Sequence, residues 1–173
     1  TILEPGVGER AAVRDSSALL ESAPGAAIVR NGQQTGIVQW RGLSGDRVNV
    51  AVDGMHITPA CPNHMDPPLH YITAQGADSL DVVAGVTPVS QGGDSIGGTV
   101  VARSAAPRFG TDAGFMSFGR IGAGYNGSNE GADGIAQVGV ANNRFSVGYT
   151  GERQTGQDLH FAGGTVRDSG FDL

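Results

Sequence analysis

Short stretches of alternating apolar and polar residues dominate the first hundred residues of the chain. Segment 48–52 has a valine at every second position and ends at the turn signal Asp53-Gly54, so it predicts a half-buried strand. Segments 79–84 and 96–103 predict two further strands around a glycine-rich turn at 91–98. These elements indicate a sheet built from short strands.

One short helix is expected before these strands. Asp15 or Ser16 is suited to cap a helix that runs through Ala18, Leu19 and Leu20, and Pro24-Gly25 ends it. A short helix followed by several short strands predicts a compact α+β unit for the first part of the chain.

Longer alternating strands follow in the second part. They are expected at 115–125, at about 133–141 and at 144–150. In the last of them, Phe145, Val147 and Tyr149 form an apolar face. Arg144 and Ser146 lie on the opposite, polar face. Alternation of this kind is typical of a sheet whose two faces meet different surroundings.

The predicted connections between these strands differ in length. Asn142-Asn143 predicts a two-residue turn, because both residues tolerate positive φ. Longer polar loops are expected at 126–132 and at about 152–170. Short turns at one end and long loops at the other match an outer-membrane barrel, but a soluble antiparallel sheet alternates in the same way. Three strands cannot close a barrel, so partner strands are expected elsewhere.

Composition narrows the class of protein. All eight prolines lie at or before Pro107, which indicates a domain boundary near 105–113. The 11 cationic residues are all arginines and stand against 17 acidic ones, a net charge of −6, so nucleic acid is not an expected partner. No apolar run approaches the ~20 residues of a membrane-spanning helix, and no charged and then apolar leader opens the chain. Any signal peptide is therefore expected to be removed already.

Soft and borderline metal ligands are concentrated between residues 55 and 70. They are Met55, His56, Cys61, His64, Met65 and His70, which include the only cysteine of the chain. Thiolate and thioether donors select copper(I), with zinc possible where nitrogen and thiolate dominate. This cluster therefore predicts a copper site.

The spacing favours two sulfur side chains of the cluster. Prolines flank Cys61, and Asp66 followed by Pro67 predicts the start of a short helix that runs to about residue 73. Cys61 and Met65 would then stand on a rigid loop before a helix, whose dipole favours a thiolate. His64 is a further candidate ligand.

The same residues also admit purely structural interpretations. A lone cysteine is usually a small buried hydrophobe and a methionine a gap-filler. His56 and His70 are expected at the surface or in packing contacts, and Met55 in the core. A catalytic pair of Cys61 and His64 has poor geometry without an orienting acid, and the turn 91–98 lacks the lysine of a phosphate-binding loop. We therefore do not expect an enzyme.

Three segments, in this order, resemble the plug domain of TonB-dependent outer-membrane receptors. They are 19–32 (LLESAPGAAIVRNG), 37–54 (IVQWRGLSGDRVNVAVDG) and 79–103 (SLDVVAGVTPVSQGGDSIGGTVVAR). The family usually carries Arg-Gly-Pro after the strand 79–84, where this chain has Ala84-Gly85-Val86-Thr87-Pro88. One salt bridge between plug and barrel is therefore expected to be lost, while the fold is kept.

The resemblance implies the fold and the surroundings. It implies an α+β plug, a small mixed sheet of about four strands with short helices, over residues 1–108. Residues 109–173 would be the first antiparallel strands of a transmembrane barrel of about 22 strands, incomplete here, as about three strands and an extracellular loop. Strand 115–125 would run outward, Asn142-Asn143 would face the periplasm and 152–170 the outside. Trp40 is expected to pack against the barrel wall.

The segment from Cys61 to Pro67, CPNHMDP, resembles the plug loop of the TonB-dependent copper receptors. Carried over residue by residue, this makes Cys61 and Met65 copper ligands, with His64 between them and further ligands from the barrel. The implied function is energised uptake of copper, as Cu(I), across the bacterial outer membrane. The implied partners are the TonB complex, copper or a copper chelate, and outer-membrane lipid. The alternative is a receptor for a siderophore or another metal chelate.

Overall fold

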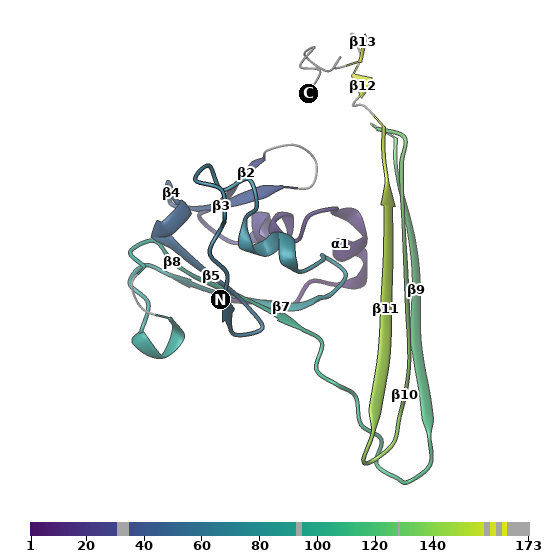
Figure 1. The fold of residues 1–173 in the computed structure, drawn as a ribbon. Helices are drawn as coiled ribbons and strands as arrows, with labels where there is room; N and C mark the ends of the chain where they lie inside the picture. Colours follow the sequence, from purple (N-terminus) through teal and green to yellow (C-terminus); the bar gives the residue numbers. More distant parts are fainter. Residues whose placement is uncertain (31–34, 93–94, 128, 158–159, 162–163, 166–173) are drawn as a thin grey trace. The chain divides into compact units, whose positions relative to one another are not determined.

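The computed structural model describes residues 1–173 except 31–34, 93–94, 128, 158–159, 162–163 and 166–173. The chain forms two compact units, Thr1–Ala106 and Pro107–Leu173 (Figure 1). No helix within the described ranges is long and apolar enough to cross a membrane.

The first unit combines short helices with two sheets. Its helices are α1 (Val7–Ala12), η1 (Ser16–Ser22), η2 (Gly45–Arg47), η3 (Pro68–Tyr71) and η4 (Val89–Gln91), all but α1 being 3-10 helices. Its strands are β1 (Ile2–Leu3), β2 (Ala26–Arg30), β3 (Gly36–Trp40), β4 (Leu43–Ser44), β5 (Val48–Val52), β6 (Met55–His56), β7 (Ala77–Ala84) and β8 (Gly98–Ser104). The sheets have the orders β1-β7-β8-β5-β6 and β2-β3-β4.

The five-stranded sheet is mixed, as expected, because β5 and β8 run parallel while the other pairs are antiparallel. It has one strand more than the resemblance implied, since β1 and β6 are two-residue strands at its edges. The apolar faces of both sheets enclose one core, in which Leu20, Leu69 and Leu80 are fully buried. Trp40 belongs to this core and is 4% exposed, so the expected contact with a barrel wall is wrong.

Local sequence signals account for most elements of this unit. The Asp15 carboxylate accepts a hydrogen bond from the Ser17 N–H (3.1 Å), which confirms the predicted cap of the helix through Ala18, Leu19 and Leu20, here η1. The turn after β5 is also confirmed, with φ of 49° at Asp53 and 80° at Gly54. Met55, however, is 60% exposed rather than buried, because it lies on the short edge strand β6.

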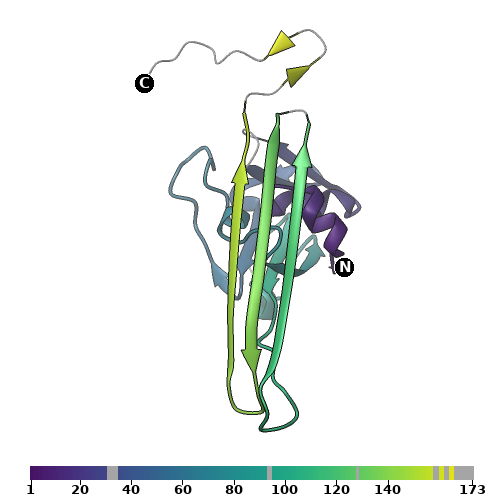
Figure 2. The same cartoon turned by 90° about the vertical axis from the view of Figure 1, so that its right-hand side faces the viewer.

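The second unit contains three long antiparallel strands, β9 (Met116–Asn126), β10 (Gly131–Ala141) and β11 (Ser146–Thr155) (Figure 2). Two short strands, β12 (His160–Phe161) and β13 (Gly164–Thr165), follow. The predicted alternation is confirmed: Ile121 pairs with Ala136, and Val138 with Tyr149, on one apolar face. This face is open, with Ile121 86% and Tyr149 69% exposed.

The opposite face of the same strands carries polar side chains and a band of glycines. The ring of Phe118 covers Gly139, where a Cβ atom would collide with it, and the Arg108 guanidinium stacks on that ring at 5.4 Å from its centroid. One aromatic side chain therefore occupies the space that the cross-strand glycine leaves open.

The connections differ from the sequence prediction. Residues 127–130 and 142–145 join the strands, so the two turns are equally short, and β11 continues to Thr155 into the predicted loop 152–170. Neither Asn142 nor Asn143 has the expected positive φ, whereas Glu130 in the other turn has a φ of 47°. The Asn142 side chain instead closes its turn by accepting hydrogen bonds from the N–H groups of Arg144 (2.8 Å) and Phe145 (2.7 Å). Much of the predicted loop beyond residue 157 lies outside the described residues.

Candidate metal centre

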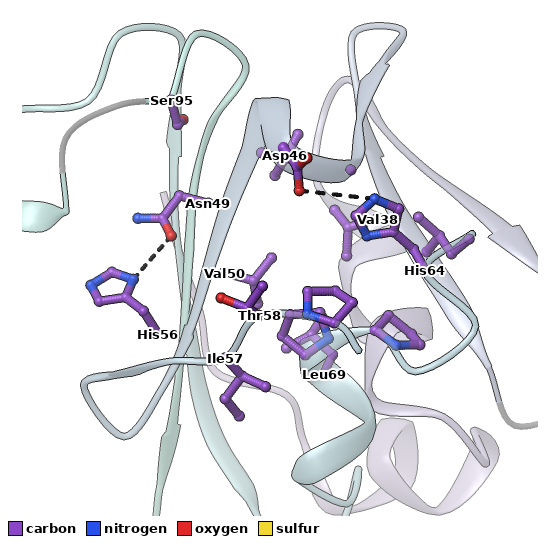
Figure 3. Close-up of a pocket in the computed structure, with 16 residues that line it drawn as sticks. Val38, Asp46, Asn49, Val50, His56, Ile57, Thr58, His64, Leu69 and Ser95 are labelled. Carbon is purple, nitrogen blue, oxygen red and sulfur yellow. Dashed lines mark hydrogen bonds and ion pairs between the residues drawn. The ribbon is translucent and has the colours of Figure 1, made fainter. Parts of the chain in front are cut away.

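The segment that carries the candidate ligands connects β6 to η3. η2 comes directly before β5 in the chain. Because β6 is antiparallel to β5, the segment after β6 runs back along β5 towards η2. A cleft of about 230 Å³ lies between the two, with His64 and Asp46 on one side and His56 with Asn49 on the other (Figure 3). Leu69 and Val38 lie at its apolar base.

Asp66 closes the ligand loop. Its carboxylate oxygens accept hydrogen bonds from the N–H groups of Ala60 (2.8 Å) and Cys61 (3.1 Å). These two hydrogen bonds lower the pKa of the Asp66 carboxyl below its usual value, so it is ionised at neutral pH. Residues 60–66 thus form a loop whose ends are tied together by one side chain.

This role corrects the predicted helix. The sequence predicted Asp66 as the cap of a helix to about residue 73, but η3 spans only Pro68–Tyr71, and Pro67 stands at its cap position with no side-chain hydrogen bond. Asp66 is engaged with the loop before it and not with the helix after it. A 3-10 helix of four residues also has too small a dipole to favour a thiolate as expected.

His64 fixes the loop to η2. Its backbone is left-handed, with φ at 52°, and its N–H donates to the Cys61 carbonyl oxygen (2.9 Å). Its ring is directed towards η2, with Nε2 3.9 Å from an Asp46 carboxylate oxygen (Figure 3). Gly45 makes room for the ring, since a Cβ atom there would lie 3.0 Å from Nε2. In this arrangement His64 faces a carboxylate.

The sulfur atoms of Cys61 and Met65 make no hydrogen bonds within the described part of the chain. Cys61 is a half-buried free thiol, and Met65 is 52% exposed. Within the described residues, no hydrogen bond engages either sulfur atom, and no group of three or more His, Cys, Asp or Glu side chains could hold a metal ion. The loop by itself therefore offers two soft donors in an open arrangement.

The other histidines of the cluster lie off this loop. The side-chain NH₂ of Asn49 donates to the Gly92 carbonyl oxygen (2.8 Å). The amide oxygen of Asn49 therefore faces Nδ1 of His56, at 3.0 Å. His56 is therefore the donor at Nδ1. His70, on η3, is exposed and meets the Tyr71 ring edge-on, with 6.4 Å between ring centroids.

The contribution of η2 to the site was not predicted. Gly45 and Asp46 precede the ligand loop by about fifteen residues, and nothing in their local sequence points to His64. Only the antiparallel return of β6 along β5 brings η2 and the loop together. The tie between Asp66 and Cys61 had a signal in the sequence, an aspartate five residues after the cysteine, which the neighbouring proline made look like a helix cap.

Solved structures share this fold. Copper transporter OprC is 28% identical and has a TM-score of 0.78, and its match covers 95% of this chain and 25% of that one. The FrpB iron transporter from Neisseria meningitidis is 18% identical (TM-score 0.65; 85% and 22% covered). The pyoverdine outer membrane receptor FpvA from Pseudomonas aeruginosa PAO1 is 15% identical (TM-score 0.66; 92% and 22% covered). The chain thus spans about a quarter of the length of these proteins.

A search of curated protein sequences gives no significant match. The family model of the TonB-dependent receptor plug domain, in contrast, matches residues 4–99, which is more than half of the chain. The matched range contains the strands from β2 to β7 and the ligand loop, and it ends at the start of β8. The chain therefore belongs to the TonB-dependent receptor plug domain family, a family of outer-membrane receptors that are not enzymes.

Proposed function

We propose that this chain is the plug, over residues 1–108, and the first barrel strands, over 109–173, of a receptor for TonB-dependent uptake of copper. Cys61 and Met65 are the plug's copper ligands. The observation that carries the proposal is the closed loop of residues 60–66, which presents two unengaged sulfur atoms. The 28% identity to a copper transporter over 95% of the chain supports the same cargo.

The donor types define the cargo. A thiolate and a thioether are soft ligands, which prefer copper(I) to the abundant hard cations. Two ligands make an incomplete site, so tight binding needs donors from the remainder of the receptor. His64 is the third donor of the loop, and coordination by its Nε2 requires the ring to leave Asp46.

The partners follow from the family. Energy for release of the copper comes from the TonB complex, and the apolar face of β9, β10 and β11 contacts outer-membrane lipid. Whether the cargo arrives as the ion or as a chelate does not alter the assignment of the two sulfur ligands. A receptor for a siderophore or another metal chelate is the competing function, and it gives Cys61 and Met65 no part in binding.

Copper binding by the full-length receptor tests the proposal. Cys61→Ala and Met65→Ala should each lower copper(I) affinity, measured by competition with a chromogenic chelator, and the double variant should abolish stoichiometric binding. His70→Ala is the matched control, because His70 is an exposed histidine nine residues from Cys61 on η3 and should leave affinity unchanged. The plug should stay folded, since neither sulfur belongs to the core. Unchanged copper content in the double variant would favour the siderophore receptor.

A further inference from the structure

The loop of residues 60–66 contains hard and borderline donors as well as soft ones, and the structure gives the two kinds different tasks. Asp66 is the hard donor, and both of its oxygens accept backbone N–H groups. His64 is the borderline donor, and its Nε2 faces Asp46. Among the cysteine, methionine, histidine and aspartate side chains of the described loop, those of Cys61 and Met65 have no hydrogen bond or ion pair.

From this division we infer that Asp66 is a positioning and specificity-determining residue: it fixes Cys61 in the orientation that binds the cargo and is itself withheld from the metal. The inference rests on the proposed function, because it assumes that Cys61 is a ligand. His64, packed on Gly45, is the second anchor of the same loop.

The positioning part follows from the backbone of Cys61. Its N–H donates to Asp66 (3.1 Å) and its carbonyl oxygen accepts from the His64 N–H (2.9 Å), so both of its backbone polar groups are held inside the loop. The direction of its Cα–Cβ bond is therefore set before any metal arrives. A ligand that is ordered in advance loses less conformational entropy on binding, which raises affinity.

The specificity part follows from the carboxylate. Calcium, magnesium and other hard cations need oxygen ligands, and carboxylates supply them most often. Asp66 is the only carboxylate within the loop, and each of its two oxygens already accepts one backbone N–H, so a metal ion would have to compete with these hydrogen bonds or share the oxygen with them. The loop consequently presents its two sulfur atoms more readily than its carboxylate, although an acidic residue stands next to Met65.

A double-mutant cycle on the full-length receptor separates positioning from general support of the fold. Asp66→Asn keeps the size of the side chain but leaves one oxygen acceptor for two N–H donors. It should weaken copper(I) binding about tenfold in the wild-type background, a loss of about 1.4 kcal/mol. In the Cys61→Ala background the same substitution should have no further effect, because the residue acts through Cys61. Asp78→Asn, at an exposed carboxylate on β7, is the matched control and should be silent in both backgrounds.

Each other outcome of the cycle has a distinct meaning. An equal loss from Asp66→Asn in both backgrounds, or no loss in either, overturns the inference while the copper function stands. No loss from Cys61→Ala itself removes the proposed function instead. X-ray absorption of the copper-loaded receptor provides the second readout: the scatterers around copper should be the same in wild type and Asp66→Asn, and loss of an oxygen neighbour would make Asp66 a ligand and overturn the inference.

Discussion

Gly36, at the start of β3, occupies a position in the plug where no side chain fits. A Cβ atom there would collide with the Ser17 hydroxyl and the Asp15 carboxylate, and it would lie 2.6 Å from Cγ2 of Ile28. Asp15 and Ser17 are also hydrogen-bonded to each other at the start of η1. The missing side chain thus lets β3 pass directly over a buried helix cap.

Gly36→Ala should therefore lower the free energy of unfolding of the plug by about 1–3 kcal/mol, because the helix cap must shift to admit a methyl group. Gly8→Ala is the matched control: Gly8 lies in α1, and a Cβ atom there meets nothing within 4 Å. This second substitution should be neutral or stabilising by up to about 1 kcal/mol. Thermal denaturation of the full-length receptor measures both, and equal melting temperatures for the two variants would contradict this account.

How well single residues could be predicted depended on whether their partners were near in sequence. Cys61 and Met65 were predicted as ligands from their chemistry and spacing, and that assignment stays a prediction. Asp15 was correctly predicted as a cap, because its partner is two residues away. Asp46 was missed, because its contact with His64 exists only through the pairing of β5 with β6.

At the scale of elements, the long strands were predictable and their ends were not. A period of two over ten residues is a strong signal, and β9, β10 and β11 all appeared where it predicted them. The ends depend on single side chains instead, as where Asn142 closes its turn through its own amide oxygen. The helix expected after Asp66 failed for the same reason, because the competing N–H donors lie earlier in the loop.

The apolar face of β9, β10 and β11 leads to a prediction about membrane assembly. Ile121, in the middle of β9, is 86% exposed on that face, so Ile121→Arg should place a charge in lipid. Such a charge costs about 2–4 kcal/mol near the bilayer midplane. We expect less of this variant to reach the outer membrane, as measured by the amount of heat-modifiable receptor in membrane fractions.

Thr150→Arg is the control for this variant. Thr150 is an exposed residue of β11 on the opposite face, where it pairs with Gln137. Its substitution should leave assembly close to the wild-type level. Comparable defects in the two variants would mean that the two faces do not differ in their surroundings.

At the scale of the whole molecule, the described strand ends fall into two groups. The Gly110 N–H donates to the Asn142 carbonyl oxygen (3.1 Å), so the connection from the plug reaches the turn between β10 and β11. At the other end of the strands, the Gln157 N–H donates to the Asn129 carbonyl oxygen (2.8 Å) in the turn between β9 and β10. The family implies that the first end faces the periplasm and the second the outside.

This orientation predicts a labelling pattern in intact cells. In a Cys61→Ser background, a Gln157→Cys receptor should react with a membrane-impermeant maleimide added to the medium. Asn143→Cys, the matched position at the opposite end, should react only after the cells are broken. The reverse pattern would mean that β9 runs inward.

The sequence indicated the family of the receptor but not the complete set of metal ligands. The family could be inferred from three segments, because their turns and strand ends are set locally. The complete ligand set of the proposed copper site has no comparable signal, because a metal site gathers side chains that are distant in sequence, and the described residues bring together no group of three or more His, Cys, Asp or Glu side chains that could hold a metal ion.

The strand order of the plug also has a consequence for the time at which it folds. β5 lies between β6 and β8, and its long partner is the parallel strand β8, which begins 46 residues after β5 ends. β1 must find β7 across a still longer stretch, since β7 begins 74 residues after β1 ends. Pairings this distant along the chain close large loops before they gain any stability, which places folding on the order of milliseconds to seconds. Until β8 is available, the valine-rich edge of β5 stays unprotected against pairing with other chains. We therefore expect the exposed edge of β5 to need shielding from other chains until β8 has joined the sheet.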